Sequence, residues 1–113
     1  EWSKRFKERH GGIPSMAHAG AYSATMHYLA AVEATGTDDP DKVMSWMKSN
    51  KPNDFFSRNA YLRADGRMVH DMLLVKIKDK ASRKSGDDIY EILNTIPGDT
   101  AFNPMLPECE FKY

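Results

Sequence analysis

Cysteine is nearly absent from this chain, which contains only Cys109 among its 113 residues. A single cysteine excludes an internal disulfide and a cysteine-based metal cluster. Such a residue is most often a small buried or surface residue, although in a longer secreted protein Cys109 could pair with a cysteine elsewhere. The cysteine content therefore leaves the redox compartment open.

The chain also lacks net charge and long apolar runs. Its 16 basic and 16 acidic side chains balance, so no overall field attracts nucleic acid, an anionic membrane or an acidic partner. A transmembrane helix needs about 20 consecutive apolar residues, and polar residues interrupt even the most apolar stretch, residues 17–34. With 41% apolar residues, the chain can still bury the modest core of one domain.

The first residues, Glu1 to Arg5, include no initiating methionine and no apolar signal region. Trp2, Phe6 and Arg9 already recur at helical spacing, and the two glycines and the proline of residues 11–14 end this helix. We therefore expect the chain to be a piece of a longer polypeptide.

Two further helices are predicted by capping signals. Ser15 can cap a long helix that ends near Gly36, and this helix carries an apolar stripe at steps of three and four residues. The stripe consists of Tyr22, Met26, Leu29 and Val32. The run Thr37-Asp38-Asp39-Pro40-Asp41 is a start signal for the next helix, because an aspartate can cap it and proline suits its first position; this helix runs to about Ser49. We expect that helix to bury Val43, Trp46 and Met47.

From residue 59 onward the apolar period changes from helical to two, which is typical of strands. Asp65-Gly66 ahead of residues 68–78 predicts a β-hairpin with a long second strand. Apolar residues occur on both faces of residues 68–78, so we expect both faces to be partly covered.

The remaining third of the chain alternates between polar and apolar segments. Residues 79–88 are rich in charged and small residues and predict an exposed loop, whereas residues 89–93 predict a third strand. The tail holds Pro97, Pro104 and Pro107, half of the chain's 6 prolines. We expect it to run in extended form over a surface without regular structure.

No catalytic or metal-binding pattern is recognisable. The four histidines lack the i, i+4 pairing of a helical metal site, and they are His10, His18, His27 and His70. Ser23 lies in a run without the final glycine of a nucleophile elbow, so we interpret it as an ordinary helix residue. The acidic run Asp38-Asp39-Pro40-Asp41 is explained by helix capping better than by a calcium loop. We expect His27 and His70 to be packed or solvent-facing, and we expect no metal, no cofactor and no enzymatic activity.

Two helices followed by a hairpin is also the order of a winged-helix DNA reader. The second of these helices carries only Lys42 and Lys48 as cations, and three aspartates lie where phosphates would approach. We keep a winged-helix-like DNA-binding module as a minor alternative, with nucleic acid as an unexpected partner.

Several short sequence pieces form an ordered series that spans nearly the whole chain. The order of the pieces carries the signal, because a single piece such as an Asp-Gly hairpin is common. The pieces are Arg5-Phe6, Gly11-Gly12-Ile13-Pro14-Ser15, His18-Ala19-Gly20-Ala21-Tyr22-Ser23-Ala24, Ala30-Ala31-Val32-Glu33-Ala34-Thr35-Gly36-Thr37, Asn53-Asp54-Phe55-Phe56, Arg63-Ala64-Asp65-Gly66-Arg67-Met68-Val69-His70-Asp71 and Thr95-Ile96-Pro97-Gly98.

In this order and spacing, the pieces resemble the solute-binding proteins of ABC importers for branched-chain amino acids. This resemblance implies an α/β fold, namely the C-terminal fragment of a two-lobed type I periplasmic binding protein. Two long helices would be followed by a β-hairpin and a further strand. Residues 1–75 would be part of lobe 1, and residues 76–113 would hold the last hinge crossing and the C-terminal part of lobe 2. The crossing strand would take up the backbone change when the lobes close.

The resemblance also implies a periplasmic receptor that binds a branched-chain amino acid or related small carboxylate and delivers it to ABC permease subunits. Its cleft contact maps onto His18, Ala19 and Gly20, with Tyr22 beside them. A helix start favours a carboxylate and small residues let it approach, but small residues can equally serve only close packing.

Two further expectations follow. A ligand-sensing domain of a regulator or receptor with the same fold is the main alternative function. A chain of this kind taken alone would leave apolar surface and sheet edges uncovered, so we also expect possible self-association.

Overall fold

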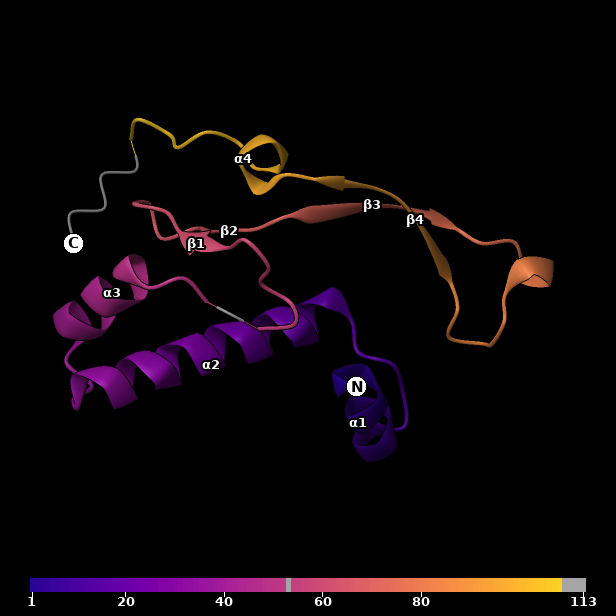
Figure 1. Cartoon of the computed structure of the whole chain (residues 1–113), viewed down its shortest axis with the longest axis horizontal. Coiled ribbons are helices and arrows are strands. Elements are labelled where there is room, and N and C mark those ends of the chain that lie inside the picture. Colours follow the sequence, from indigo (N-terminus) through magenta and orange to yellow (C-terminus); the bar gives the residue numbers. More distant parts are fainter. Residues whose placement is uncertain (53, 109–113) are drawn as a thin grey trace.

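The computed structural model describes residues 1–52 and 54–108, so the predictions for Cys109 and for Asn53 of the Asn53-Asp54-Phe55-Phe56 piece lie outside the described residues. The chain order is three helices, a hairpin, a long ribbon and a short helix (Figure 1). Their bounds are α1 Trp2–His10, α2 Met16–Thr35, α3 Pro40–Ser49, β1 Tyr61–Leu62, β2 Met68–Val69, β3 Met72–Ile77, a 3₁₀ turn Lys80–Ser82, β4 Tyr90–Ile96 and α4 Gly98–Ala101. This mixture of helices and strands confirms the predicted α/β class.

The helix boundaries follow from the predicted caps. Ser15 precedes α2 in extended conformation, and Gly36 ends the helix with a left-handed backbone at φ 67°, where its N–H donates to the carbonyl of Val32. The Asp39 carboxylate accepts a hydrogen bond from the backbone N–H of Lys42 at 3.1 Å, with Pro40 at the first helical position. The short connection turns α3 back against α2.

The predicted apolar stripe of α2 is not its buried face. Tyr22, Met26 and Leu29 are 37%, 46% and 50% exposed. The buried residues instead recur every fourth position, and they are Ala19, Ser23, His27 and Ala31. Apolar residues of α2 occur on more than one of its faces, so the periodicity alone did not decide which face is buried. The small side chains of the buried face, such as Ala19 and Ser23, let α3 and the segment after it approach closely.

The burial expected for α3 is correct in kind. Val43 is fully buried at 4% exposure, and Trp46 and Met47 are half-buried. The ring of Trp46 lies 5.7 Å from that of His27, and His27 Nε2–H donates to the carbonyl of Met47 at 3.2 Å. His27 is therefore packed between the two helices, as predicted.

The predicted hairpin is present, but its long second strand is interrupted. In β1 and β2, Tyr61 pairs with Val69 and Leu62 with Met68, around a turn in which Gly66 has φ 81°. The strand expected over residues 68–78 breaks at His70 and Asp71, and its second half, β3, pairs with β4 instead. The break arises because Asp71 directs both carboxylate oxygens to other segments, as described below.

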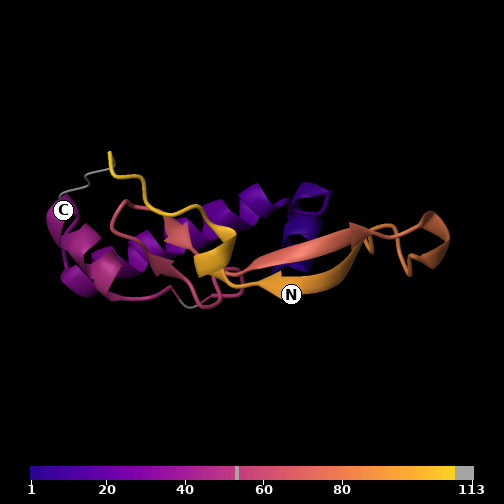
Figure 2. The same ribbon diagram turned by 90° about the horizontal axis from the view of Figure 1, so that it is seen from above.

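The strands β3 and β4 form an antiparallel ribbon that projects beyond α2 and α3 (Figures 1 and 2). The pairing extends the predicted third strand to residue 96 and contains a bulge, because Leu74 opposes Asn94 whereas Val75 opposes Ile92. The coverage expected for both faces is absent from the described residues of this chain, where the large apolar side chains of the ribbon are exposed. These are Leu73, Leu74, Val75, Ile77, Tyr90, Ile92 and Leu93.

The projecting ribbon makes the molecule extended. Its radius of gyration is 17.0 Å, whereas a compact domain of this length would have about 13 Å. The turn beyond the ribbon, expected to be an exposed loop, contains a short 3₁₀ helix and returns to α1 through an ion pair between Lys7 and Asp87.

The C-terminal segment is more regular than predicted. Residues Gly98–Ala101 form the helix α4, which lies beside the β1–β2 hairpin rather than running on as extended chain. Pro97 is compatible with this helix because it is the residue before the first turn. At that position a backbone N–H would have no acceptor within the helix, so its absence in proline costs no hydrogen bond.

Over residues 1–52 and 54–108, no helix is both long enough and apolar enough to span a membrane.

Gly98 provides a test of this packing. A Cβ atom there would lie 2.9 Å from the carbonyl carbon and oxygen of His70 and from Cγ1 of Val69. We expect Gly98→Ala to destabilise the chain by about 1–3 kcal/mol because the buried contact must open. Urea unfolding measures this change. Gly86→Ala is the control, since nothing lies within 4 Å of its Cβ position; equal loss in both variants would contradict the packing described.

Candidate functional site

The four residues predicted to contact a ligand lie on the first two turns of α2, but they face different neighbours. His18 is exposed, Ala19 is buried, Gly20 is half-buried and Tyr22 is 37% exposed. The structure therefore does not place all four side chains on one surface.

His18 stabilises the start of the helix. Its Nδ1 accepts a hydrogen bond from the backbone N–H of Ser15 at 3.1 Å and lies 2.8 Å from the Ser15 hydroxyl. An accepting Nδ1 places the proton of the neutral ring on Nε2. An exposed N–H donor is thus held at the helix terminus, where the backbone dipoles also favour an anion.

Ala19 and Gly20 serve close packing. Ala19 is 8% exposed, and a Cβ atom on Gly20 would lie 3.7 Å from Cε1 of Phe56. The absence of a side chain at residue 20 therefore lets the segment after α3 lie against the helix.

Tyr22 belongs to an aromatic cluster, defined here as Trp2, Phe6, Tyr22 and Phe55. Trp2 stacks on Phe55 with centroids 4.9 Å apart, and Tyr22 lies 5.5 Å from Trp2 and 5.7 Å from Phe55. His18 adjoins the same cluster through Phe6, at 5.0 Å. The cluster brings His18 and Tyr22 to one region, although no ring contact of the described residues joins them directly.

A buried polar network lies behind this region, and sequence reasoning missed it. The hydroxyls of Ser23 and Ser57 are 2.6 Å apart and both residues are almost fully buried. Asp54 Oδ1 accepts hydrogen bonds from the backbone N–H groups of Phe56 at 2.8 Å and Ser57 at 2.7 Å. The spacing Asp54-x-Phe56-Ser57 is typical of an Asx turn and could have predicted this arrangement.

The Asp54 carboxylate is the charged member of the network. Partial burial raises its pKa, but hydrogen bonds from Ser23 and from the backbone of Ser57 and Phe56, with the charge of His27, outweigh burial and lower the pKa below its usual value. The Ser23 hydroxyl contacts Ser57 and Asp54, so the network joins α2 to the loop after α3.

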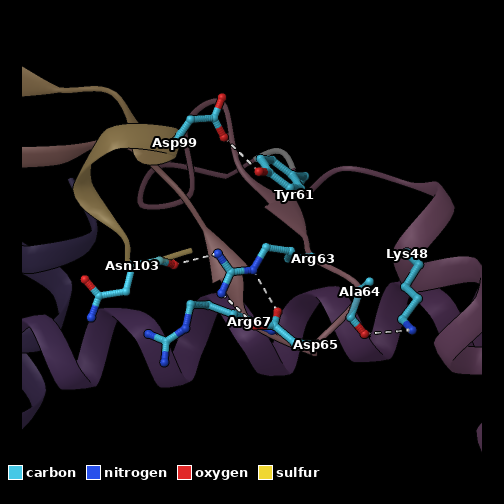
Figure 3. A network of polar contacts seen from close by, with 8 residues as sticks. All are labelled: Lys48, Tyr61, Arg63, Ala64, Asp65, Arg67, Asp99 and Asn103. Carbon is cyan, nitrogen blue, oxygen red and sulfur yellow. Dashed lines mark hydrogen bonds and ion pairs between the residues drawn. The ribbon is translucent and has the colours of Figure 1, made fainter. Parts of the chain in front are cut away.

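A second polar network joins the hairpin to the C-terminal segment (Figure 3). Arg63 donates to both carboxylate oxygens of Asp65, at 2.8 and 2.6 Å, and to the carbonyl of Asn103 at 2.8 Å. The Tyr61 hydroxyl donates to Asp99 at 2.7 Å, and this hydrogen bond raises the pKa of Tyr61. Lys48 of α3 reaches the carbonyl of Ala64 at 3.5 Å. These contacts fix the C-terminal segment on the hairpin.

No group of three or more potential metal ligands occurs within residues 1–52 and 54–108. His70, predicted to be packed or solvent-facing, is half-buried and contacts the rings of Phe56 and Phe102.

The comparisons with known proteins agree on one family. The family model described as periplasmic binding protein matches residues 1–84. A search of curated proteins found no match. Two similar crystal structures are a periplasmic binding protein from Burkholderia mallei, 40% identical, and a branched chain amino acid ABC transporter periplasmic ligand-binding protein from Burkholderia xenovorans, 41% identical. Each matches with a TM-score of 0.86 and covers 90% of this chain, which spans only 27% of either structure.

The Arg63–Asp65 pair generates a pH prediction. The hydrogen bonds from Arg63 lower the pKa of Asp65 from 3.8 to about 2. A carboxyl whose pKa is lowered by folding stabilises the fold at pH values above its pKa in the unfolded chain. This contribution decreases as the pH falls from about 4 to about 2. We expect Asp65→Asn to lower the unfolding midpoint at pH 7 and to make a much smaller difference near pH 2, where about half of the native Asp65 carboxyls are protonated; urea titration at each pH measures both differences. Asp38→Asn, an exposed substitution, controls for the lost charge; a deficit of Asp65→Asn that is as large at pH 2 as at pH 7 would contradict this assignment.

Proposed function

Since this chain belongs to the periplasmic binding protein family, we propose that it forms part of the extracytoplasmic solute receptor of an ABC importer. In the whole receptor the solute is a branched-chain amino acid or a related small carboxylate, which the receptor delivers to the permease subunits. The observation that carries this proposal is the 41% identity, over 90% of the chain, to a branched chain amino acid ABC transporter periplasmic ligand-binding protein.

The receptor binds and releases its solute without chemical conversion, and it acts in the periplasm. Membership of a solute-binding family supports both statements. The buried Ser23 and Ser57 and the half-buried Asp54 act in packing, as their contacts indicate.

The proposed lobe division assigns residues 1–75 to lobe 1 and residues 76–113 to the last hinge crossing and lobe 2. The projection of β3 and β4 beyond α2 and α3 supports a ribbon that reaches toward a second lobe. The boundary at residue 75 falls inside β3. Within this proposal, the contacts of Asp99 and Asn103 with the hairpin keep part of residues 76–113 next to lobe 1.

The proposed solute contact lies at the start of α2. His18 Nε2–H donates to a solute carboxylate oxygen, because Nδ1 is already used by Ser15. Tyr22 presents its partly exposed ring to the apolar part of the solute. Ala19 and Gly20 complete this site by letting the helix lie close to its neighbours.

The uncovered surface supports self-association of the isolated chain. Its accessible surface is 8680 Å², whereas a compact monomer of 12.8 kDa exposes about 6,300 Å². The excess of about 2,400 Å² is within the range buried in obligate interfaces. Exposed apolar side chains of the ribbon form part of this surface, and within the described residues both outer edges of the two-stranded ribbon lack a further strand.

Solute binding is tested on the product of the complete reading frame. We expect leucine, isoleucine, valine or a related carboxylate to raise its melting temperature, whereas the 113-residue chain alone binds them weakly or not at all in calorimetry. A thermal-shift screen that finds no stabilising amino acid or carboxylate would overturn the proposal.

The role of His18 has a matched control. His10 also contacts Phe6, with ring centroids 4.5 Å apart, but it lies on α1. We expect His18→Ala in the complete receptor to weaken solute binding about tenfold or more, the loss of a hydrogen bond to a charged group. His10→Ala should bind normally, and equal affinities in the two variants would remove His18 from the site.

Self-association is tested by placing charges on the ribbon. We expect the 113-residue chain to form dimers or larger species in sedimentation velocity, and Ile77→Lys with Ile92→Lys to shift it toward monomer because charge opposes apolar burial. The control is Met16→Lys with Met105→Lys, at exposed apolar positions outside the ribbon. A monomeric starting chain would contradict this prediction.

A further inference from the structure

His70 lies at the junction of β2 and β3 and contacts rings from two distant parts of the chain. The Phe56 ring comes from the segment after α3, with centroids 5.4 Å apart, and the Phe102 ring follows α4, with centroids 5.3 Å apart in an edge arrangement. These three rings form what we call the junction stack. Residues 46 positions apart in sequence are thereby connected through one imidazole.

The outer ends of the junction stack are also held. Phe56 lies against Gly20 of α2, where a Cβ atom would be 3.7 Å from its ring, and the Asp54 carboxylate binds its backbone N–H. On the other side, the Arg67 guanidinium lies 5.7 Å from the centroid of Phe102. The stack therefore runs from the start of α2, through the junction, to the end of α4.

The backbone at the junction is fixed by its own hydrogen bonds. His70 Nδ1–H donates to the carbonyl of Asp71 at 2.9 Å. This hydrogen bond fixes the orientation of the His70 ring relative to the backbone. Asp71 accepts from the backbone N–H of Gly98 at 3.2 Å and from the side-chain amide of Asn59 at 3.0 Å. Gly98 in turn lies so close to the His70 carbonyl that a Cβ atom there would be 2.9 Å away. Movement of α4 is thus opposed by contacts with the junction.

We propose that His70 is a positioning residue that couples the start of α2 to residues 97–102 through Phe56 and Phe102. Packed rings transmit displacement because they cannot interpenetrate. In the receptor, the coupling connects the solute-contacting helix to the strand that leaves the helical body, where closure changes backbone angles. That last role rests on the proposed function. The coupling itself is measured without solute, so its failure and the failure of solute binding are distinguishable.

The test is amide hydrogen exchange in the 113-residue chain. Phe56→Ala removes one ring contact to His70, and we expect exchange of the Gly98 and Phe102 amides to become about two- to tenfold faster, the range for losing one aromatic pair. Phe55→Ala is the matched control, since the neighbouring ring contacts Trp2 and Tyr22. That variant should leave the two amides unchanged relative to the amide of Ala31, which is fully buried inside α2 and monitors opening of the helical body.

A double-substitution series separates coupling from simple loss of stability. In a His70→Ala background, Phe56→Ala should no longer change exchange at Gly98 and Phe102, whereas in a His70→Phe background, which keeps a ring, the effect should return. Phe56→Leu serves if Phe56→Ala does not fold. Unchanged exchange in both Phe56 variants, or equal effects of Phe55→Ala and Phe56→Ala, would overturn the proposal. So would persistence of the Phe56 effect without a ring at residue 70.

Discussion

The close approach of backbone to one face of α2 is the constraint on which the helical part of the structure depends. Ala19, Gly20 and Ser23 present little or no side chain, so the segment after α3 can lie directly on the helix. Once it lies there, the hydroxyls of Ser23 and Ser57 must satisfy each other, because water no longer reaches them. Asp54 then holds this loop by accepting hydrogen bonds from the backbone N–H groups of Phe56 and Ser57. A larger residue on this face would displace the loop and expose polar groups without partners.

The strands depend on a second constraint, at His70 and Asp71. The carboxylate of Asp71 binds both Gly98 and Asn59, and it thereby separates one extended run into β2 and β3. The hairpin and the C-terminal segment remain with the helices, whereas β3 and β4 project from them. The exposed apolar side chains of the ribbon are consistent with a chain that spans 27% of the similar solved structures. Exposed apolar surface of this kind marks an interaction surface.

Local signals predicted the elements well. Asp39, Pro40 and Gly36 act through groups within a few residues of themselves, so capping was readable without tertiary information. The Asp65-Gly66 turn is local in the same sense. The solute site stays a prediction from family resemblance, and the structure adds only the exposure of its side chains: His18 and Tyr22 are exposed, whereas Ala19 is buried.

The sequence by itself determined the family, the α/β class, the helix limits and the hairpin, because each depends on neighbouring residues or on an ordered series of motifs. Only the tertiary structure decided which face of the uniformly apolar α2 is buried, where the strand after Val69 breaks, and that Ser23 and Asp54 share a network. It also decided that residues 98–101 form a helix on the hairpin. These features depend on contacts between residues far apart in the chain, whose partners periodicity cannot identify.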